Sequence, residues 1–504
     1  MEALTELKNL DHEIILLTHA IDTLRWDQET YMPEAAVAEK AEQVALLQGL
    51  VHDRVTSPRQ GALFAQAGVT ERNKADPPGP DDVSRAFLRE AYRRYSKQVK
   101  TPKALVEELA KTQSLAQAEW IKARRGSDFA LFQPYLEKLV ELLKKYASCQ
   151  GYTDQAYDAL LDEYEPWMTT RELESLFDGL TDRLVPLYEK IRSSGKQGDD
   201  EVLRRSFPIE RQRIFGLEVL KAMGFDFNRG RLDVSAHPFT TTLGRDDVRL
   251  TTRYNEHFFP SAVFGNIHEG GHGLYEQGFA PALRPSLLAA GTSLGIHESQ
   301  SRLWENMVGR SRGFWNHFYP RLRELFPEAL DGVDGEAFYR AVNTVRPSFI
   351  RVEADEVTYN LHIILRFTLE KKIFAGKLGL DELPSAWEAE SKRLLGIKPG
   401  TAAQGVLQDV HWSMGAFGYF PTYTLGNLAA AQFFAALRAA RPDTEREIER
   451  GELNGVLGWL RENVHGHGSV YPAQTLLKRV TGEPLTSGAF MDYLESKYGE
   501  LYDL

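Results

Sequence analysis

The sequence predicts a mainly α-helical protein that contains one small β-sheet. Apolar residues recur at helical spacing through most of the chain, and between Arg231 and Tyr254 the pattern changes to short β-branched segments separated by turn residues. One helical stripe runs through Glu13–Leu24 and consists of Ile14, Leu17, Ala20, Ile21 and Leu24. No long Pro-, Gly- or Ser-rich linker divides the chain, so we predict a single domain over residues 1–504.

The N-terminal part, residues 1–230, has a nearly continuous helical pattern. Apolar spacing predicts helices at Ala35–Val51 and Leu131–Tyr146, and the proline-rich stretch Asp76–Pro80 breaks the helical pattern between segments. Thr169–Glu172 has the composition of a helix start, with a threonine able to cap and an acidic residue in the first turn. This part is therefore predicted to be almost entirely helical.

Three short strands are predicted next, at Arg231–Ser235, Phe239–Leu243 and Val248–Tyr254. Helical spacing then returns and predicts helices that include Glu298–Arg310, Phe338–Val345 and Glu356–Ala375. Residues 231–504 thus contain the sheet and the C-terminal helices. An exposed edge strand of this sheet could bind a peptide by main-chain pairing, although the sheet could equally be a cover over the core.

Composition excludes several classes of protein. A net charge of −11 argues against a surface for nucleic acid or anionic membranes, and no apolar run approaches the length of a membrane span. The single Cys149 excludes an internal disulfide framework and a multi-cysteine zinc site, and fits a reducing compartment. The N-terminal residues lack the pattern of a secretory signal. We therefore expect a cytoplasmic protein.

A possible metal site lies at His268-Glu269-Gly270-Gly271-His272. Residues four apart lie on the same face of a helix, so His268 and His272 can bind one metal ion, most plausibly zinc. Glu269 can then accept a proton from the attacking water. Two adjacent glycines are unfavourable in a helix and indicate that a strand or a substrate passes close to the backbone. The alternative is a helix with two hydrogen-bonded histidines and a solvated glutamate.

A zinc site with two histidines normally takes a third protein ligand and a water. Four downstream residues are candidates: Glu276, His297, Glu298 and Glu305. Adjacent helical residues diverge by about 100°, so only one of His297 and Glu298 can readily face the metal. We favour Glu298, because its distance from His272 leaves room for a turn and a returning helix, and keep His297 as the alternative.

Blocks of sequence outside this motif point to a known family. They are WDQETYMP at Trp26–Pro33, DEYEPWMTT at Asp162–Thr170, HPF at His237–Phe239, DVRLT at Asp247–Thr251, HESQS at His297–Ser301, IRVEAD at Ile350–Asp355, GVLQDVHW at Gly405–Trp412 and GAFGYFPTYTLGN at Gly415–Asn427. Together with HEGGH they resemble the thermostable (Taq-type) carboxypeptidase family of HEXXH zinc metallopeptidases, in the same order over nearly the whole chain. Trp167 stands where the family pattern has glycine.

The resemblance implies a two-lobed, neurolysin-like helical metallopeptidase, with a deep groove and the small sheet beside the active site. It also implies metal-dependent release of C-terminal residues from peptides, with broad side-chain preference and poor activity at proline. Homodimers are typical of the family, and cobalt can replace zinc. By the same resemblance, His268, His272 and Glu298 are the metal ligands and Glu269 is the general base.

A carboxypeptidase also needs a cation that binds the terminal carboxylate of its substrate. Arg351 and Arg249 are the candidates, although each could instead form a structural ion pair, with Asp355 or Asp247 respectively. Three further residues are candidate hydrogen-bond donors. His411 and Tyr423 could donate to the developing oxyanion, and Tyr419 could donate to the substrate. Alternatively, all three could make structural hydrogen bonds only.

Other activities are compatible with the same motif. An endo-oligopeptidase or a dipeptidase could use the same helices and metal. A non-catalytic helical scaffold is disfavoured, because a purely structural zinc site closes with four protein ligands and has no use for Glu269.

Overall fold

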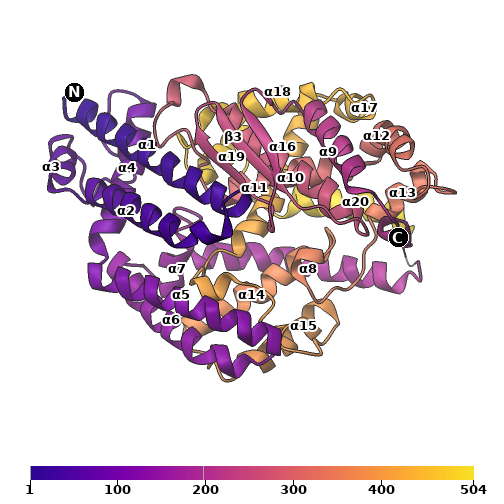
Figure 1. The fold of residues 1–504 in the computed structure, drawn as a ribbon, viewed down its shortest axis with the longest axis horizontal. Helices are drawn as coiled ribbons and strands as arrows, with labels where there is room; N and C mark the ends of the chain where they lie inside the picture. The colour runs from indigo at the N-terminus through magenta and orange to yellow at the C-terminus, as the bar shows by residue number, and fades with distance from the viewer. Residues whose placement is uncertain (1, 197) are drawn as a thin grey trace. The chain divides into compact units, whose positions relative to one another are not determined.

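A computed structural model describes residues 2–196 and 198–504. The described residues are mainly helical and form one three-stranded sheet, as the sequence predicts (Figure 1). The described chain forms two compact units, and each is assembled from separated segments. The first contains Met1–Val99, Asp199–Val342 and Phe433–Pro484, and the second contains Lys100–Gly198, Asn343–Gln432 and Leu485–Leu504.

The helices of the first unit are α1 (Glu2–Thr30), α2 (Val37–Val55), α3 (Pro58–Gln66), α4 (Asp82–Lys100), α9 (Ile209–Met223), α10 (Phe259–Gly278), α11 (Leu294–Arg302), α12 (Arg312–Leu325), α13 (Gly335–Val342), α17 (Thr444–Glu449), α18 (Asn454–Asn463) and α19 (Ala473–Thr481). Its core includes a cluster of aromatic rings from α9, α10, α12 and α13, such as Phe215, Phe259, Phe318 and Phe338. Helix α10 also packs against α9, α11 and strand β3. The helix with the HEGGH motif is therefore at the centre of this unit.

The sheet consists of β1 (Gly230–Val234), β2 (Thr240–Gly244) and β3 (Asp247–Thr252), close to the predicted strands. Their order is β1-β3-β2, with β3 parallel to β1 and antiparallel to β2. The predicted third strand is therefore the central one, and the edges are β1 and β2. Strand β2 lies against α1 and α10, so it is the edge strand beside the HEGGH helix.

The helices of the second unit are α5 (Lys103–Gly126), α6 (Phe129–Gln150), α7 (Ala156–Leu161), α8 (Thr170–Ser193), α14 (Tyr359–Phe374), α15 (Leu383–Leu395) and α20 (Gly488–Tyr502). Helices α5 and α6 lie side by side (Figure 1), and α14 packs against α7, α8 and α15. Almost every residue of α14 is buried, as expected of a helix that is covered on all sides. Helix α16 (Pro421–Ala440) begins in the second unit and ends in the first.

Two local details bear on the sequence predictions. The predicted helix Glu298–Arg310 is not one regular helix, because α11 ends at Arg302 and a π-helical turn, η4, follows at Leu303–Val308. π-Helical turns are rare in proteins, and those that occur are often found at functional sites. Trp167, where the family pattern has glycine, has φ 72°, in the left-handed region that favours glycine. Trp167 therefore adopts a backbone conformation that glycine reaches with less strain.

No helix among the described residues combines the length and the apolar content needed to cross a bilayer.

Candidate metal centre

Helix α10 holds His268, Glu269 and His272 in a tightly packed place. A Cβ added to Gly271 would lie 2.6 Å from the carbonyl oxygen of Gln300, and one added to Gly270 would lie 2.5 Å from the side chain of Leu220. The two glycines predict that a strand or a substrate passes close to this backbone. Instead, the backbone of α11 approaches Gly271 and side chains of α9 fill the space at Gly270. Glycine at position 271 thus allows α11 to lie close enough to bring Glu298 to the histidines.

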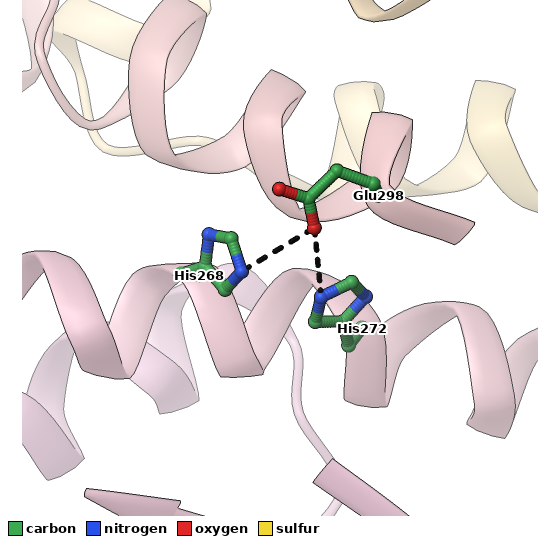
Figure 2. Close-up of side chains that lie close together, drawn as sticks. All are labelled: His268, His272 and Glu298. Carbon is green, nitrogen blue, oxygen red and sulfur yellow. Dashed lines mark ion pairs between the residues drawn. The ribbon is translucent and has the colours of Figure 1, made fainter. Parts of the chain in front are cut away.

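His268, His272 and Glu298 converge on one point (Figure 2). The Nε2 atoms of His268 and His272 lie 3.5 Å and 3.3 Å from the same Glu298 oxygen, and the three candidate ligand atoms lie within 4.8 Å of one another. Two imidazoles and one carboxylate form a donor set that zinc and similar divalent metals bind with an open position for water.

Charged groups surround the proposed ligands. Oε2 of Glu305 lies 2.9 Å from Nδ1 of His268, which leaves Nε2 of that ring to face Glu298. Arg302 donates to Oε1 of Glu298 over 2.7 Å and to Glu305 over 3.2 Å. Arg310 also donates to Glu305, over 3.4 Å. A carboxylate on the second nitrogen of a ligating histidine is a common support of metal sites.

The ionisation states of this cluster suit a metal ion. Burial alone would raise the pKa of Glu298, but Arg302 and the two histidines hold it well below its ordinary value. Burial and the neighbouring His297 lower the pKa of His272 to about 3. Against the effect of burial, Glu298 and Glu305 raise the pKa of His268, so a positive charge is favoured at that ring. An ionised carboxylate, a neutral imidazole and a preference for a cation are the properties that metal binding requires. The residues therefore fit a divalent metal.

Glu269 is buried beside the proposed ligands, with 6% of its surface exposed. Its Oε2 accepts a hydrogen bond from Thr240 of β2 over 2.6 Å, and the same hydroxyl lies 3.1 Å from the Glu269 carbonyl oxygen. Burial raises the pKa of the Glu269 carboxyl, partly offset by His268 and Thr240. A raised pKa brings the carboxylate closer to the basicity that proton transfer near neutral pH needs.

The other two candidate ligands are paired with each other. Nε2 of His297 lies 2.8 Å from Oε1 of Glu276, and Oε2 of Glu276 accepts from Thr242 over 2.7 Å. The His297 ring stacks on His272 with centroids 4.5 Å apart. Of the four candidates that the sequence leaves open, the structure brings Glu298 to the two histidines, places Glu305 behind His268, and places His297 against the side of His272.

Arg249 forms the ion pair that the sequence analysis gave as its alternative role. Its Nε and Nη2 each lie 2.8 Å from an oxygen of Asp247. The guanidinium also lies over the ring of Trp26, 4.1 Å from its centroid. Trp26 belongs to the WDQETYMP block, so Arg249 joins β3 to the end of α1.

Arg351 of the second unit is buried, with 5% of its surface exposed. Its Nε and Nη2 lie 3.1 Å and 2.8 Å from Oδ1 of Asp409, and its Nη1 donates to the hydroxyl of Tyr359 over 2.8 Å. The prediction that Asp355 would be the ion-pair partner of Arg351 is therefore wrong. The Asp355 carboxylate instead accepts hydrogen bonds from the neighbouring backbone, including the amides of Val357 and Thr358.

The remaining predicted residues lie together near Arg351. Nε2 of His411 lies 3.2 Å from the hydroxyl of Tyr423, and the rings of Tyr419 and Tyr423 lie 5.4 Å apart. The guanidinium of Arg351 lies 4.9 Å from the centroid of Tyr423. Burial lowers the pKa of His411 to about 4, so this imidazole is neutral. The structure thus brings four predicted site residues into one cluster of the second unit.

Several residues that hydrogen-bond within or beside these clusters were not predicted from the sequence: Thr240, Arg302, Arg310, Arg366, Glu370 and Asp409. Asp409 lies within the GVLQDVHW block, and membership of that block could have identified it as a site residue. Arg366 and Glu370 are charged residues in an otherwise apolar helical stretch, and that contrast was a second signal.

Known carboxypeptidases are similar to this chain over nearly its whole length. Residues 6–498 match the family described as carboxypeptidase Taq (M32) metallopeptidase. The chain is 45% identical over 488 residues to thermostable carboxypeptidase 1 of Thermus thermophilus, covering 95% of this chain and 94% of that protein. It is 40% identical over 499 residues to carboxypeptidase 1 of Bacillus subtilis, covering 98% and 97%. The crystal structure of an M32 carboxypeptidase from Deinococcus radiodurans R1 superposes with a TM-score of 0.95 at 40% identity, covering 100% of each chain.

Proposed function

Because the chain belongs to the carboxypeptidase Taq (M32) metallopeptidase family and is therefore a metallocarboxypeptidase, we propose that it releases C-terminal amino acids from peptides with broad side-chain preference and poor activity at proline. The observation that carries the proposal is the convergence of His268, His272 and Glu298 beside the buried Glu269. A site that activates water for peptide hydrolysis needs a Lewis acid and a base. The three converging residues suit the binding of a metal ion as the Lewis acid, and Glu269 suits the role of the base.

His268, His272 and Glu298 are the proposed ligands of a divalent metal, which we take to be zinc, with cobalt as a functional substitute. When bound, such an ion lowers the pKa of a coordinated water and polarises the carbonyl of the substrate. Glu305 and Arg302 orient His268 and Glu298 through the hydrogen bonds described above. The protein thus contributes a fixed arrangement of ligands.

Glu269 is the proposed general base. Its burial raises its pKa, and the hydrogen bond from Thr240 fixes the direction of the carboxylate. In this role it accepts the proton of the attacking water on a carboxylate oxygen. It then delivers that proton to the nitrogen of the leaving amino acid, so the carboxylate is regenerated.

Five residues have proposed roles towards the substrate. Arg351 and Arg249 are the candidates for the terminal carboxylate, and Tyr419 is a further substrate contact. His411 and Tyr423 are the proposed donors to the developing oxyanion, a role that typically contributes about 3–4 kcal/mol per donor. These roles rest on the family blocks and on the local surroundings of each residue, including the neutral state of His411. Strand β2 is the proposed edge for main-chain pairing with a peptide.

We also propose that residues 1–504 act as one catalytic domain, that the protein is a homodimer and that it works in the cytoplasm. The single cysteine supports the last point, because a reducing compartment does not favour disulfides.

The test is digestion of one peptide, as free acid and as C-terminal amide, followed by mass spectrometry. The metal-loaded protein should produce a ladder of single-residue losses from the free acid only. Glu269→Gln should bind metal like the wild type and lose about 10²–10⁴-fold in rate. A Glu276→Gln variant on the same helix is the matched control and should keep its activity. Internal cleavage of both peptides would instead assign an endopeptidase.

A further inference from the structure

Glu370 is a buried carboxylate of α14 that has no part in the chemistry proposed above. Its side chain is 0% exposed. Three donors surround it: the hydroxyl of Tyr157 at 2.7 Å, Nε1 of Trp412 at 2.7 Å and the backbone amide of Gly418 at 3.0 Å. An ionised carboxylate can accept from all three donors, because it carries only acceptor sites.

Two of these donors lie at the two ends of one short segment, Trp412–Gly418. Oε1 of Glu370 accepts from Trp412, and Oε2 accepts from Gly418, so the carboxylate bridges the segment. The rings of Trp412 and Phe417 stack with an interplanar angle of 8°. At Gly418 φ is 86°, and an added Cβ would lie 2.8 Å from the backbone of Leu160 in α7. The segment is therefore held between α7 and α14.

Proposed site residues flank this segment directly. His411 precedes Trp412, and Tyr419 follows Gly418. His411 reaches Tyr423 over 3.2 Å, and the ring of Tyr419 lies 5.3 Å from that of His411. A shift of either end of the segment would therefore move His411 or Tyr419 away from Tyr423.

We propose that Glu370 is a positioning residue for the carboxypeptidase reaction, which closes the segment Trp412–Gly418 and thereby holds His411 and Tyr419 in their working places. The inference rests on the roles proposed for those two residues. Glutamine has nearly the same shape but presents an NH₂ group to one of the donors. A protonated carboxyl likewise places a hydrogen against a donor. The bridge is therefore strongest in the ionised form, whose oxygens only accept.

The charge state of Glu370 gives a readout that a purely structural role would not affect. Burial raises the pKa of Glu370 to about 7, although Gly418, Tyr157, Trp412 and Arg366 all act to lower it. Tyr164 also faces it and remains neutral, because burial raises the pKa of its hydroxyl well above the ordinary value. Below about pH 7 the carboxyl takes up a proton and the bridge is weakened. Activity should therefore fall on the acid side of pH 7 in the wild type.

The experiment compares Glu370→Gln with the wild type on a free-acid peptide, with zinc-loaded protein of verified metal content. We expect kcat to fall about 100-fold, the size typical of misplaced catalytic groups, while metal content is unchanged. Activity loss on the acid side of pH 7 should also become shallower in the variant. Glu356→Gln is the matched control, since Glu356 is also a buried carboxylate (8% exposed) and its partners, Tyr493, Tyr498 and Lys497, lie in α20. It should lose stability without a comparable loss of kcat.

A second variant keeps the test decisive if Glu370→Gln does not fold. Trp412→Phe removes one donor, and its kcat should fall about tenfold at unchanged metal content. Wild-type kcat in these variants, or an equal loss in Glu356→Gln, would overturn the inference. His411→Ala and Tyr423→Phe separate the two levels of the proposal. If they are impaired while Glu370→Gln is not, the positioning role alone fails, and if they are fully active the proposed donor roles fail.

Discussion

Replacing Glu305 by glutamine should weaken metal binding, although Glu305 is not one of the three proposed ligands. Its Oε2 lies 2.9 Å from Nδ1 of His268, so the carboxylate keeps the proton of that ring on Nδ1 and leaves Nε2 facing Glu298. Glutamine can still accept from Nδ1 through its oxygen. It lacks the negative charge that makes the imidazole a stronger ligand.

The size of the effect follows from what Glu305 contacts. A hydrogen-bonding partner of a ligating histidine is typically worth about 10–100-fold in metal affinity, or about 1.4–2.7 kcal/mol. We expect the upper part of that range, because Glu305 also accepts from Arg302 and Arg310 over 3.2 Å and 3.4 Å. Without the carboxylate, these two guanidinium groups would be less neutralised beside a dication.

Zinc affinity can be measured by competition with a chelator of known affinity, at constant pH and ionic strength. Glu276→Gln is the matched control: Glu276 also pairs with a histidine, His297, over 2.8 Å, but His297 is not a proposed ligand. The control should keep an affinity close to that of the wild type. Equal losses in the two variants, or wild-type affinity in Glu305→Gln, would refute the assignment of Glu305 as the partner of a ligand.

Three further predictions concern the fold. Gly271→Ala should lower the free energy of unfolding by about 1–3 kcal/mol and weaken zinc binding, because the new Cβ would lie 2.6 Å from the Gln300 carbonyl oxygen, whereas Gly265→Ala, with only a 3.9 Å contact, should be tolerated in urea titrations. Trp167→Gly should raise the melting temperature through about 1 kcal/mol of relieved backbone strain at φ 72°, and a lower melting temperature would show that the ring contributes more than the strain costs. Burial, with Arg366 and Arg351, lowers the pKa of His362 from 6.5 to about 3, so below pH 6.5 the unfolded state binds a proton that the folded state does not. Stability should therefore fall as pH drops from 6.5 towards 3, by up to about 1.4 kcal/mol per pH unit for this group, and His362→Gln should remove that part of the slope.

Features with a local cause could be predicted from the sequence. The HEGGH spacing depends only on helical geometry, and the alternation of β-branched residues located the three strands closely. The choice among four candidate third ligands depends instead on how α11 lies against α10. Gly271 and the packing of the whole unit set how closely α11 approaches α10. Spacing along the chain favoured Glu298 as a ligand, but it could not show that Glu305 lies behind His268, on its Nδ1 side.

Sequence distance was a poor guide to the ion pairs for a related reason. Asp355 is close to Arg351 in sequence, but its carboxylate already accepts backbone hydrogen bonds at the start of α14, whereas Asp409 is held by both Arg351 and Arg366. Burial alone would raise the pKa of Asp409, yet the two guanidinium groups hold it below its ordinary value.

Arg366 and Glu370 are four residues apart on α14, and both bind the same stretch of chain, Asp409–Gly418. A helix that is buried on all sides has little need for charged residues unless they hold something in place, since each costs desolvation energy. Two charges at this spacing in an apolar helix therefore predict an ordered segment opposite them, and in this protein that segment carries His411.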